Sequence, residues 1–271
     1  MIHFFFYLII FIFGLAVGSF LNCVIYRLEK KQSFLKGRSY CPYCKHILKW
    51  QDLIPIFSFL ILKGKCHYCQ KKISWQYPLV EISTALIFLL IFNFSAFGGS
   101  AQGWQNIFTI LYLLVISSFL IIIFVYDLKH YIIPDKVVYP LIGITFLYQL
   151  FGIWNLEFGI WNFKPLICAI LSAIFASGFF LFIVFISKGR AMGIGDIKLA
   201  FFMGFFLGFP NILVALFFAF MIGAIIGIGL ILMKKKTLKS EVPFGPFLIT
   251  GTFIAFFWGQ ILINWYFKLL I

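Results

Sequence analysis

The chain has 271 residues, of which 63% are hydrophobic and only 11% are charged, and its formal net charge is +14. Soluble globular proteins do not have so apolar a composition, which excludes an ordinary soluble domain. The basic excess would suggest nucleic-acid binding in a soluble chain. In a membrane protein, however, Lys and Arg gather in the loops on one side of the bilayer, and we therefore exclude nucleic acid as a partner.

Eight apolar stretches alternate with breaks that are charged or rich in Gly, Pro and Asn, and most approach the ~20 residues that a helix needs to cross a bilayer. The sixth is short, opens with Asp196 and Lys198, and is separated from the seventh only by residues 208–210, whose Gly and Pro favour a tight turn. The sequence thus predicts an all-α polytopic membrane protein with about eight transmembrane helices. These run roughly from His3 to Ile25, Leu79 to Phe97, Ile107 to Tyr126, Val137 to Trp154, Phe163 to Ile186, Gly195 to Phe209, Asn211 to Met233 and Phe244 to Tyr266.

The distribution of basic residues predicts the topology. With the N-terminus outside, eight crossings place segments 27–78, 127–136, 187–195 and 234–243 on one common side. Twenty of the 22 Lys and Arg residues lie on or beside that side. Because basic loops stay in the cytoplasm, this side is predicted to be cytoplasmic.

The first helix could instead be a cleaved signal peptide, since it is N-terminal and apolar. A signal peptide carries its basic residues before the apolar run, whereas here Arg27, Lys30 and Lys31 follow it and no Lys or Arg precedes it. We therefore expect a retained helix.

The one sizeable polar stretch, residues 27–78, contains Cys41, Cys44, Cys66 and Cys69 as two CxxC pairs separated by 21 residues. This is the spacing of a zinc ribbon, in which two CxxC turns complete a tetrahedral thiolate shell around Zn²⁺. Two disulfides or free thiols are the alternative, although a cytoplasmic loop lies in a reducing compartment. Four thiolates leave no open coordination position, so the predicted role is structural.

The histidines and the remaining cysteines of the chain are assigned more ordinary roles. His46 and His67 lie beside the CxxC pairs and could replace a thiolate, but solvated loop histidines are the simpler interpretation. Cys23 and Cys168 fall in apolar helices, where they are expected to pack.

Two aspartates fall at the ends of predicted membrane helices, where ionisable residues are costly and are functional candidates by default. Asp127 ends the third helix and Asp196 opens the sixth, and the topology places both at the same face. Gly193 and Gly195 flank the second acid, and because they lack a Cβ they would let an extended peptide approach.

Two carboxylates held close share one proton, so that the charged member can activate water while the protonated member polarises a scissile carbonyl. This chemistry suits a protease that needs no covalent intermediate. The alternative is structural: Asp127 forms an interfacial ion pair with Lys129 or Lys198, and Asp196 caps its helix. The residues alone leave both interpretations open.

In order and spacing, a series of short motifs resembles the type IV prepilin peptidase family, whose members are aspartyl membrane proteases of the GxGD kind. The likeness covers nearly the whole chain. The motifs are Gly18-Ser19-Phe20-Leu21-Asn22 with Ile25-Tyr26-Arg27, the paired CxxC loop with Ile54-Pro55, residues 73–81 (ISWQYPLVE), residues 127–135 (DxxHxxIPD), residues 192–199 (MGIGDIKL) and Pro243-Phe244-Gly245-Pro246-Phe247.

The resemblance implies that Asp127 and Asp196 are the catalytic pair, with Gly193, Gly195 and Lys198 as active-site support. It implies cleavage of the basic leader from type IV prepilins, pseudopilins or competence pilins after a Gly, at the cytoplasmic face of the bacterial inner membrane. It further implies methylation of the new N-terminal residue, usually Phe, with S-adenosylmethionine as donor, although no pattern marks where this donor binds. The family often has a second acid two residues after the first Asp, where this chain has Lys129, and Asp135 is expected to be a loop or capping residue.

Three predicted parts follow: residues 1–26 as the first helix, 27–78 as a small cytoplasmic zinc-ribbon-like domain, and 79–271 as a seven-helix peptidase domain. An ion- or proton-coupled transporter, with the two aspartates along its path, is the main alternative, and a membrane assembly protein whose zinc loop docks partners is a third. Spaced glycines predict close helix contacts within the chain or between copies, which leaves the oligomeric state open. These pairs are Gly14 and Gly18, Gly204 and Gly208, and Gly223 and Gly227.

Overall fold

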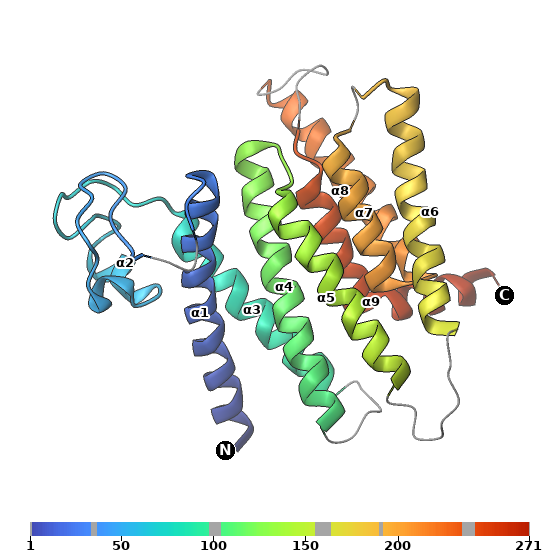
Figure 1. Ribbon diagram of the computed structural model, residues 1–271, viewed down its shortest axis with the longest axis horizontal. Coiled ribbons are helices and arrows are strands. Elements are labelled where there is room, and N and C mark those ends of the chain that lie inside the picture. Colours follow the sequence, from blue (N-terminus) through green and yellow to red (C-terminus); the bar gives the residue numbers. More distant parts are fainter. Residues whose placement is uncertain are drawn as a thin grey trace. The chain divides into compact units, whose positions relative to one another are not determined.

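The structure is a computed structural model that describes residues 2–33, 37–97, 104–154, 164–189, 192–234 and 242–270 (Figure 1). Within these residues it is helical, apart from loops and two isolated β-bridges. The helices are α1 (Ile2–Glu29), a short 3-10 helix η1 (Trp50–Leu53), α2 (Phe57–Ile61), α3 (Gln76–Phe97), α4 (Trp104–His130), α5 (Asp135–Trp154), α6 (Lys164–Ile186), α7 (Ile194–Leu207), α8 (Asn211–Leu232) and α9 (Gly245–Leu270).

Each of the eight predicted membrane segments coincides with a helix. In the described part of the chain, six helices are long and apolar enough to cross a bilayer, namely α1, α3, α4, α6, α8 and α9. The other two are α5 and α7, and α7 has only 14 residues. The prediction of an all-helical polytopic membrane protein is confirmed, and the count of eight crossings is approximate.

The chain divides into two compact units, Met1–Ile122 and Ile123–Ile271. In the first, α1 and α3 pack closely because α1 presents glycines to α3. A Cβ at Gly14 would lie 2.5 Å from the Cα of Ala85, and one at Gly18 would lie 2.6 Å from the Cα of Glu81. The spacing of these two glycines thus serves a helix contact within the chain.

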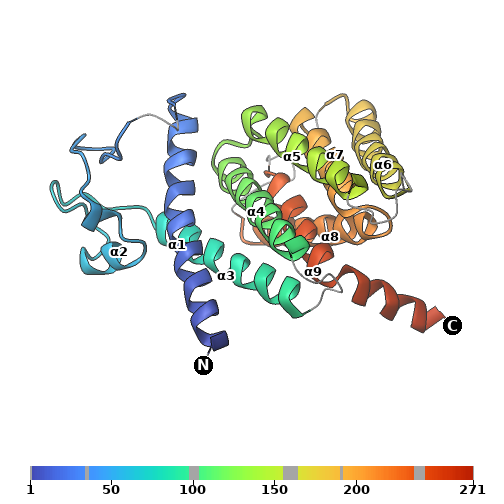
Figure 2. The same ribbon diagram turned by 60° about the horizontal axis from the view of Figure 1, so that its bottom comes forward.

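The short helix α7 is the centre of the second unit and packs against α5, α6, α8 and α9. Its Leu199, Phe202 and Met203 are fully buried, so a short helix that is apolar on all sides is covered by its neighbours. It ends at Gly208, whose φ of 66° is left-handed, and α8 begins at Asn211. The predicted tight turn between the two helices is therefore present. Figure 2 shows the helices of this unit from a second direction.

Candidate active site and metal site

Asp127 lies near the C-terminal end of α4 and is 4% exposed. Its Oδ2 accepts a hydrogen bond of 3.0 Å from the backbone N–H of Gly245, the first residue of α9. The first turn of a helix leaves N–H groups without helical partners and carries a partial positive charge, so it stabilises a carboxylate. Asp127 therefore occupies an anion-binding position at the start of α9.

An aromatic cluster fixes the start of α9. The ring of Phe244 packs against Phe220 of α8 and Phe180 of α6, with ring centroids 5.1 Å and 6.1 Å away. Gly245 directly follows this anchored ring. A Cβ at Gly245 would lie 2.6 Å from Oδ2 of Asp127, so the close approach of carboxylate and backbone requires glycine.

Asp196 stands in the first turn of α7 and is 9% exposed. The backbone N–H of Gly193, the residue that caps α7, donates a hydrogen bond of 3.1 Å to its Oδ2. The capping geometry expected under the structural alternative is thus present. It also holds the carboxylate in a fixed orientation at a second helix N-terminus.

Ile133 connects the surroundings of the two acids. This buried side chain lies in the loop between α4 and α5. A Cβ at Gly195 would meet the Cβ of Ile133 at 3.0 Å, and one at Gly245 would meet its Cδ1 at 3.4 Å. The backbones next to both acids therefore converge on one side chain.

Lys198, predicted as active-site support, forms an ion pair with another acid. Its Nζ lies 2.7 Å from Oδ1 of Asp135 and 5.0 Å from the ring centroid of Tyr139. Asp135 begins α5, so this pair joins α5 to α7 beside the aspartate site. The ion pair expected between Asp127 and Lys198 under the structural alternative is thus replaced by one with Asp135.

Of the two flanking glycines, Gly193 is exposed, and a Cβ there would lie 3.8 Å from Oδ2 of Asp196. Gly195 faces Ile133 instead. The absence of a Cβ therefore serves internal packing at Gly195, whereas the surface at Gly193 is open.

The four cysteines converge in the loop between α1 and α3. Their Sγ atoms all lie within 4.8 Å of one another, and those of Cys41 and Cys69 are 3.9 Å apart. A tetrahedral zinc site with Zn–S bonds of about 2.3 Å places its sulfurs roughly 3.8 Å apart. All four thiols are free, so the arrangement is one convergent cluster and not two disulfide pairs.

The two CxxC turns have the same backbone structure. The N–H of Cys41 donates to the carbonyl of His46 at 2.9 Å, and that of Cys66 donates to the carbonyl of Lys71 at the same distance. Lys45 and Gln70 occupy equivalent positions and share a left-handed φ near 60°. Each turn directs its two thiols toward one common centre, as zinc knuckles do.

The pKa values of Cys41 and Cys69, whose sulfurs are 3.9 Å apart, shift in opposite directions. Burial opposes ionisation of Cys41, but hydrogen bonds from the backbone N–H groups of Cys44 and Tyr43 lower its pKa to about 7. The Lys71 amide favours the Cys69 thiolate, whereas desolvation and the neighbouring thiols raise its pKa to about 11. Four thiolates so close together need a divalent cation to neutralise them, and Zn²⁺ suits an all-sulfur shell.

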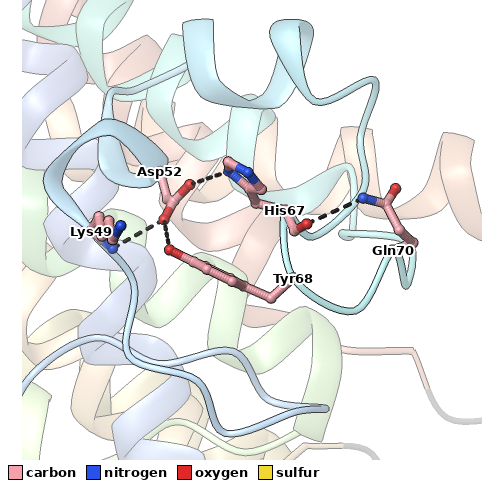
Figure 3. A network of polar contacts seen from close by, with 5 residues as sticks. All are labelled: Lys49, Asp52, His67, Tyr68 and Gln70. Atoms are coloured by element: carbon pink, nitrogen blue, oxygen red, sulfur yellow. Dashed lines mark hydrogen bonds and ion pairs between the residues drawn. The ribbon is translucent and has the colours of Figure 1, made fainter.

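A polar network braces the second CxxC turn, as Figure 3 shows. Oδ2 of Asp52 in η1 accepts hydrogen bonds from the Lys49 N–H at 3.0 Å and the Tyr68 hydroxyl at 3.2 Å, and its Oδ1 lies 3.4 Å from Nδ1 of His67. Partial desolvation and the Asp52 carboxylate raise the pKa of Tyr68, which keeps its phenol a donor. The ring of His46 lies 3.7 Å from that of Tyr68. Both histidines thus pack against Tyr68, and the four members of the thiol cluster are cysteines.

Two residues of the aspartate site carried no predicted role. Gly245 belongs to a motif quoted above, and the Pro that follows it is a typical helix-start signal that could have drawn attention to it. Ile133 lies inside the DxxHxxIPD motif, but an apolar residue in an apolar chain gives no signal of its own. Glu241, a further acid that could receive a basic leader, lies outside the described residues.

Two protein-family models match the chain. Residues 12–94 match the bacterial peptidase A24 N-terminal domain, and residues 114–228 match the type IV leader peptidase family. No solved structure shows a significant match to the chain.

Three proteins named prepilin leader peptidase/N-methyltransferase are similar over almost their whole length. The one from Aeromonas salmonicida (strain A449) is 30% identical over 95% of this chain and 92% of its own. Those from Legionella pneumophila and Bacillus subtilis (strain 168) are both 32% identical, over 97% and 96% of this chain and 94% and 98% of their own. The chain belongs to the type IV leader peptidase family.

Proposed function

We propose that the protein is a bifunctional enzyme of the bacterial inner membrane, which removes the leader of type IV prepilins with Asp127 and Asp196 and then methylates the new N-terminus. The observation that carries the peptidase assignment is the pair of buried carboxylates from separate helices, each held by a backbone N–H at a helix N-terminus, with the neighbouring backbones meeting at Ile133. The names of the relatives support both activities, and the transporter alternative gains no support from them.

The proposed chemistry uses one proton shared by the two acids. The ionised aspartate takes a proton from water, whose oxygen adds to the scissile carbonyl carbon, while the protonated aspartate donates a hydrogen bond to the carbonyl oxygen. The intermediate collapses when the peptide nitrogen receives a proton and the C–N bond breaks. Fixed backbone donors hold both carboxylates in place, so little reorganisation is needed during the reaction.

The substrates and the orientation follow from the same assignment. The basic leaders of prepilins remain in the cytoplasm, and the distribution of Lys and Arg supports a cytoplasmic position for residues 27–78 and both aspartates, with the N-terminus outside. We include pseudopilins and competence pilins among the substrates, because they share the basic leader followed by an apolar helix. Functionally, residues 1–26 form the first membrane helix, 27–78 a metal-binding domain and 79–271 the peptidase domain.

The metal and the methyl donor have separate roles. Cys41, Cys44, Cys66 and Cys69 would hold a structural Zn²⁺ that stabilises the loop. S-adenosylmethionine would supply the methyl group, which passes from its sulfonium sulfur to the α-amino nitrogen exposed by cleavage while that nitrogen loses a proton. The purified protein should both cleave a prepilin and transfer a labelled methyl group to it. Cleavage without methyl transfer would contradict the proposed methyltransferase activity.

The decisive experiment measures cleavage of a co-expressed prepilin by membranes that carry the wild type, Asp127→Asn or Asp196→Asn. Asparagine keeps the size and polarity of the side chain but cannot share the proton, so each single variant should lose about 10²–10⁴-fold in rate. The amount of each variant in the membrane is measured in parallel.

Asp135→Asn is the matched control, because Asp135 lies near the site but binds Lys198. Its cleavage rate should change by no more than about fivefold. If both Asp127→Asn and Asp196→Asn still cleave at the control rate, the catalytic assignment is wrong.

A further inference from the structure

The short helix α2, in the loop that carries the cysteines, has an apolar face with no protein cover. Its Phe57, Leu60 and Ile61 are 62%, 62% and 77% exposed. Their spacing places them on one side of the helical turn. Phe59 points the other way, and its ring packs against Trp75 with centroids 5.0 Å apart. The turn therefore has one apolar side packed within the loop and a second apolar side left open, which is more than a water-facing loop requires.

A hydrogen bond ties the start of α2 to a residue inside a membrane helix. The backbone N–H of Ile56 donates to Oε2 of Glu81 at 2.8 Å, and Glu81 is 6% exposed. Glu81 lies five residues beyond Gln76, where α3 begins, which corresponds to about 7.5 Å of helix. The start of α2 therefore lies beside the second turn of α3, and not beyond the N-terminus of that helix.

The contact between α1 and α3 also places Glu81 away from the helix ends, at a greater distance from the end of α1 than from the start of α3. Gly18 of α1 lies against Glu81, and α1 continues for eleven residues beyond Gly18 to Glu29, roughly 16 Å of helix. Both helices are candidate membrane spans at these positions. Figures 1 and 2 show α2 in the loop between α1 and α3.

The backbone at the tether is strained. Ile56 has a φ of 60°, a conformation that is unfavourable for a β-branched residue. Such a conformation persists only where its surroundings hold it, and here the buried Glu81 carboxylate accepts its N–H. The position of α2 is thus imposed by the contact with α3.

The residues around α2 have the composition of a membrane interface. Trp50 and Trp75 are 72% and 69% exposed, and Lys49, Lys63 and Lys65 are exposed on either side of the helix. Trp concentrates at the level of lipid headgroups, and Lys is attracted to the anionic lipids of the inner leaflet.

We propose that α2 is an interfacial anchor, which inserts Phe57, Leu60 and Ile61 into the boundary between headgroups and acyl chains beside α1 and α3. Interfacial helices bury their apolar face about 5–10 Å deep, which is comparable with the distance of about 7.5 Å along α3 between its first residue and Glu81. The occupant of this face is the lipid of the bilayer that α1 and α3 already cross. The anchor holds the cysteine loop down on the membrane surface, and it does not depend on the proposed peptidase activity.

Photocrosslinking of the full chain in nanodiscs of phosphatidylethanolamine and phosphatidylglycerol tests this anchor. Benzoylphenylalanine replaces Phe57 in one variant, Phe20 in a second and Tyr43 in a third, and lipid adducts are counted by mass spectrometry. The three aromatic residues are 62%, 55% and 60% exposed. Phe20 of α1 is the lipid-facing reference, and Tyr43, whose ring lies 4.8 Å from the Lys71 ammonium, is the water-facing reference.

Position 57 should give lipid adducts at a yield close to that of position 20 and several-fold above that of position 43. A yield at position 57 as low as at position 43 would overturn the anchor. So would an adduct at position 57 that changes from lipid to peptide when a prepilin is added, because the face would then be a substrate surface. Neither readout requires cleavage, so the anchor can fail while the peptidase assignment stands.

The tether is tested with two further substitutions in the protein labelled at position 57. Glu81→Gln keeps an acceptor oxygen for the Ile56 N–H and should preserve the lipid yield, whereas Glu81→Met removes it and should lower the yield several-fold. The corresponding proteins labelled at position 20 show whether α1 and α3 remain inserted. An unchanged yield at position 57 in Glu81→Met would show that the hydrogen bond does not set the depth of α2.

Discussion

The aspartate site and the cysteine site are built in opposite ways. Asp127 is held by a backbone N–H that is 118 residues away in the sequence, whereas the four cysteines lie within residues 41–69 and come from two copies of one turn. The first site exists only when α4, α7 and α9 are packed together. The second can form locally once a metal is bound.

This difference determines how each site responds to mutation. The aspartates depend on close approaches between backbones and side chains, so the addition of a single methyl group can disturb them. The cysteine loop has a small core and depends on its ligands, so the loss of a thiol matters more than a change in packing. Both sites belong to one chain, and each can be broken while the other is measured.

After replacement of either aspartate itself, the largest effect is expected from Gly245→Ala. The new Cβ would lie 2.6 Å from Oδ2 of Asp127, so the carboxylate or the start of α9 must move. A displacement of this size in a catalytic group costs on the order of 10²-fold in rate. We expect such a loss of prepilin cleavage, with one zinc per chain retained. Gly143→Ala in α5 is the control, since a Cβ there meets no atom within 4 Å, and equal activity in the two variants would contradict the geometry of the site.

The converse change is Cys41→Ser, which removes a buried ligand from the thiol cluster. Metal analysis should show zinc falling from one per chain to near zero, and limited proteolysis should cut residues 37–75 faster, because metal binding supplies folding free energy to this loop. Cleavage should fall less than in Gly245→Ala.

Cys168→Ser is the matched control, since Cys168 lies exposed on α6 and is not a member of the cluster. It should keep its zinc. If Cys41→Ser also retained a full zinc, the cluster would not be the metal site.

The sequence is sufficient to predict those features whose signal is local. Apolar stretches indicate the membrane helices, the spacing of the CxxC pairs indicates the thiol cluster, and Asp127 and Asp196 stand out because ionisable groups are costly in apolar helices. The part played by Gly245 depends on a tertiary contact that no local pattern encodes.

The remaining differences between sequence and structure also have physical reasons. The central position of α7 follows from packing on all its sides, while the sequence shows only a short apolar stretch. Helix α2 has five residues and no periodic pattern of its own, and its position is set by the hydrogen bond between Ile56 and Glu81. Such contacts between distant segments are not visible in a single sequence.

A smaller effect should distinguish the two glycines beside Asp196. In Gly195→Ala the new Cβ would lie 3.0 Å from the Cβ of Ile133, so Ile133 must shift by a few tenths of an ångström, and cleavage should fall by about tenfold or less. In Gly193→Ala the nearest atom would be 3.8 Å away, and the backbone φ of −85° suits alanine.

Kinetics with a purified prepilin separate packing from substrate approach at these positions. Gly195→Ala should lower kcat, because it disturbs the support of the acid. If Gly193→Ala instead raises KM, the exposed surface at Gly193 contacts the substrate. If Gly195→Ala has the kcat of the wild type, Ile133 shifts without any loss of activity.

The smallest effect is expected at the ion pair between Lys198 and Asp135, which joins α5 to α7 beside the aspartates. The Asp135 side chain is 57% exposed, and ion pairs at such sites contribute little, so Lys198→Met and Asp135→Asn should each change the cleavage rate by no more than about fivefold. Because the two groups act on each other, the double variant should be no worse than the poorer single variant. A loss in Lys198→Met that greatly exceeds the loss in Asp135→Asn would mean that the ammonium acts on the aspartates or on the substrate directly, and the support of the catalytic pair would then be electrostatic as well as architectural.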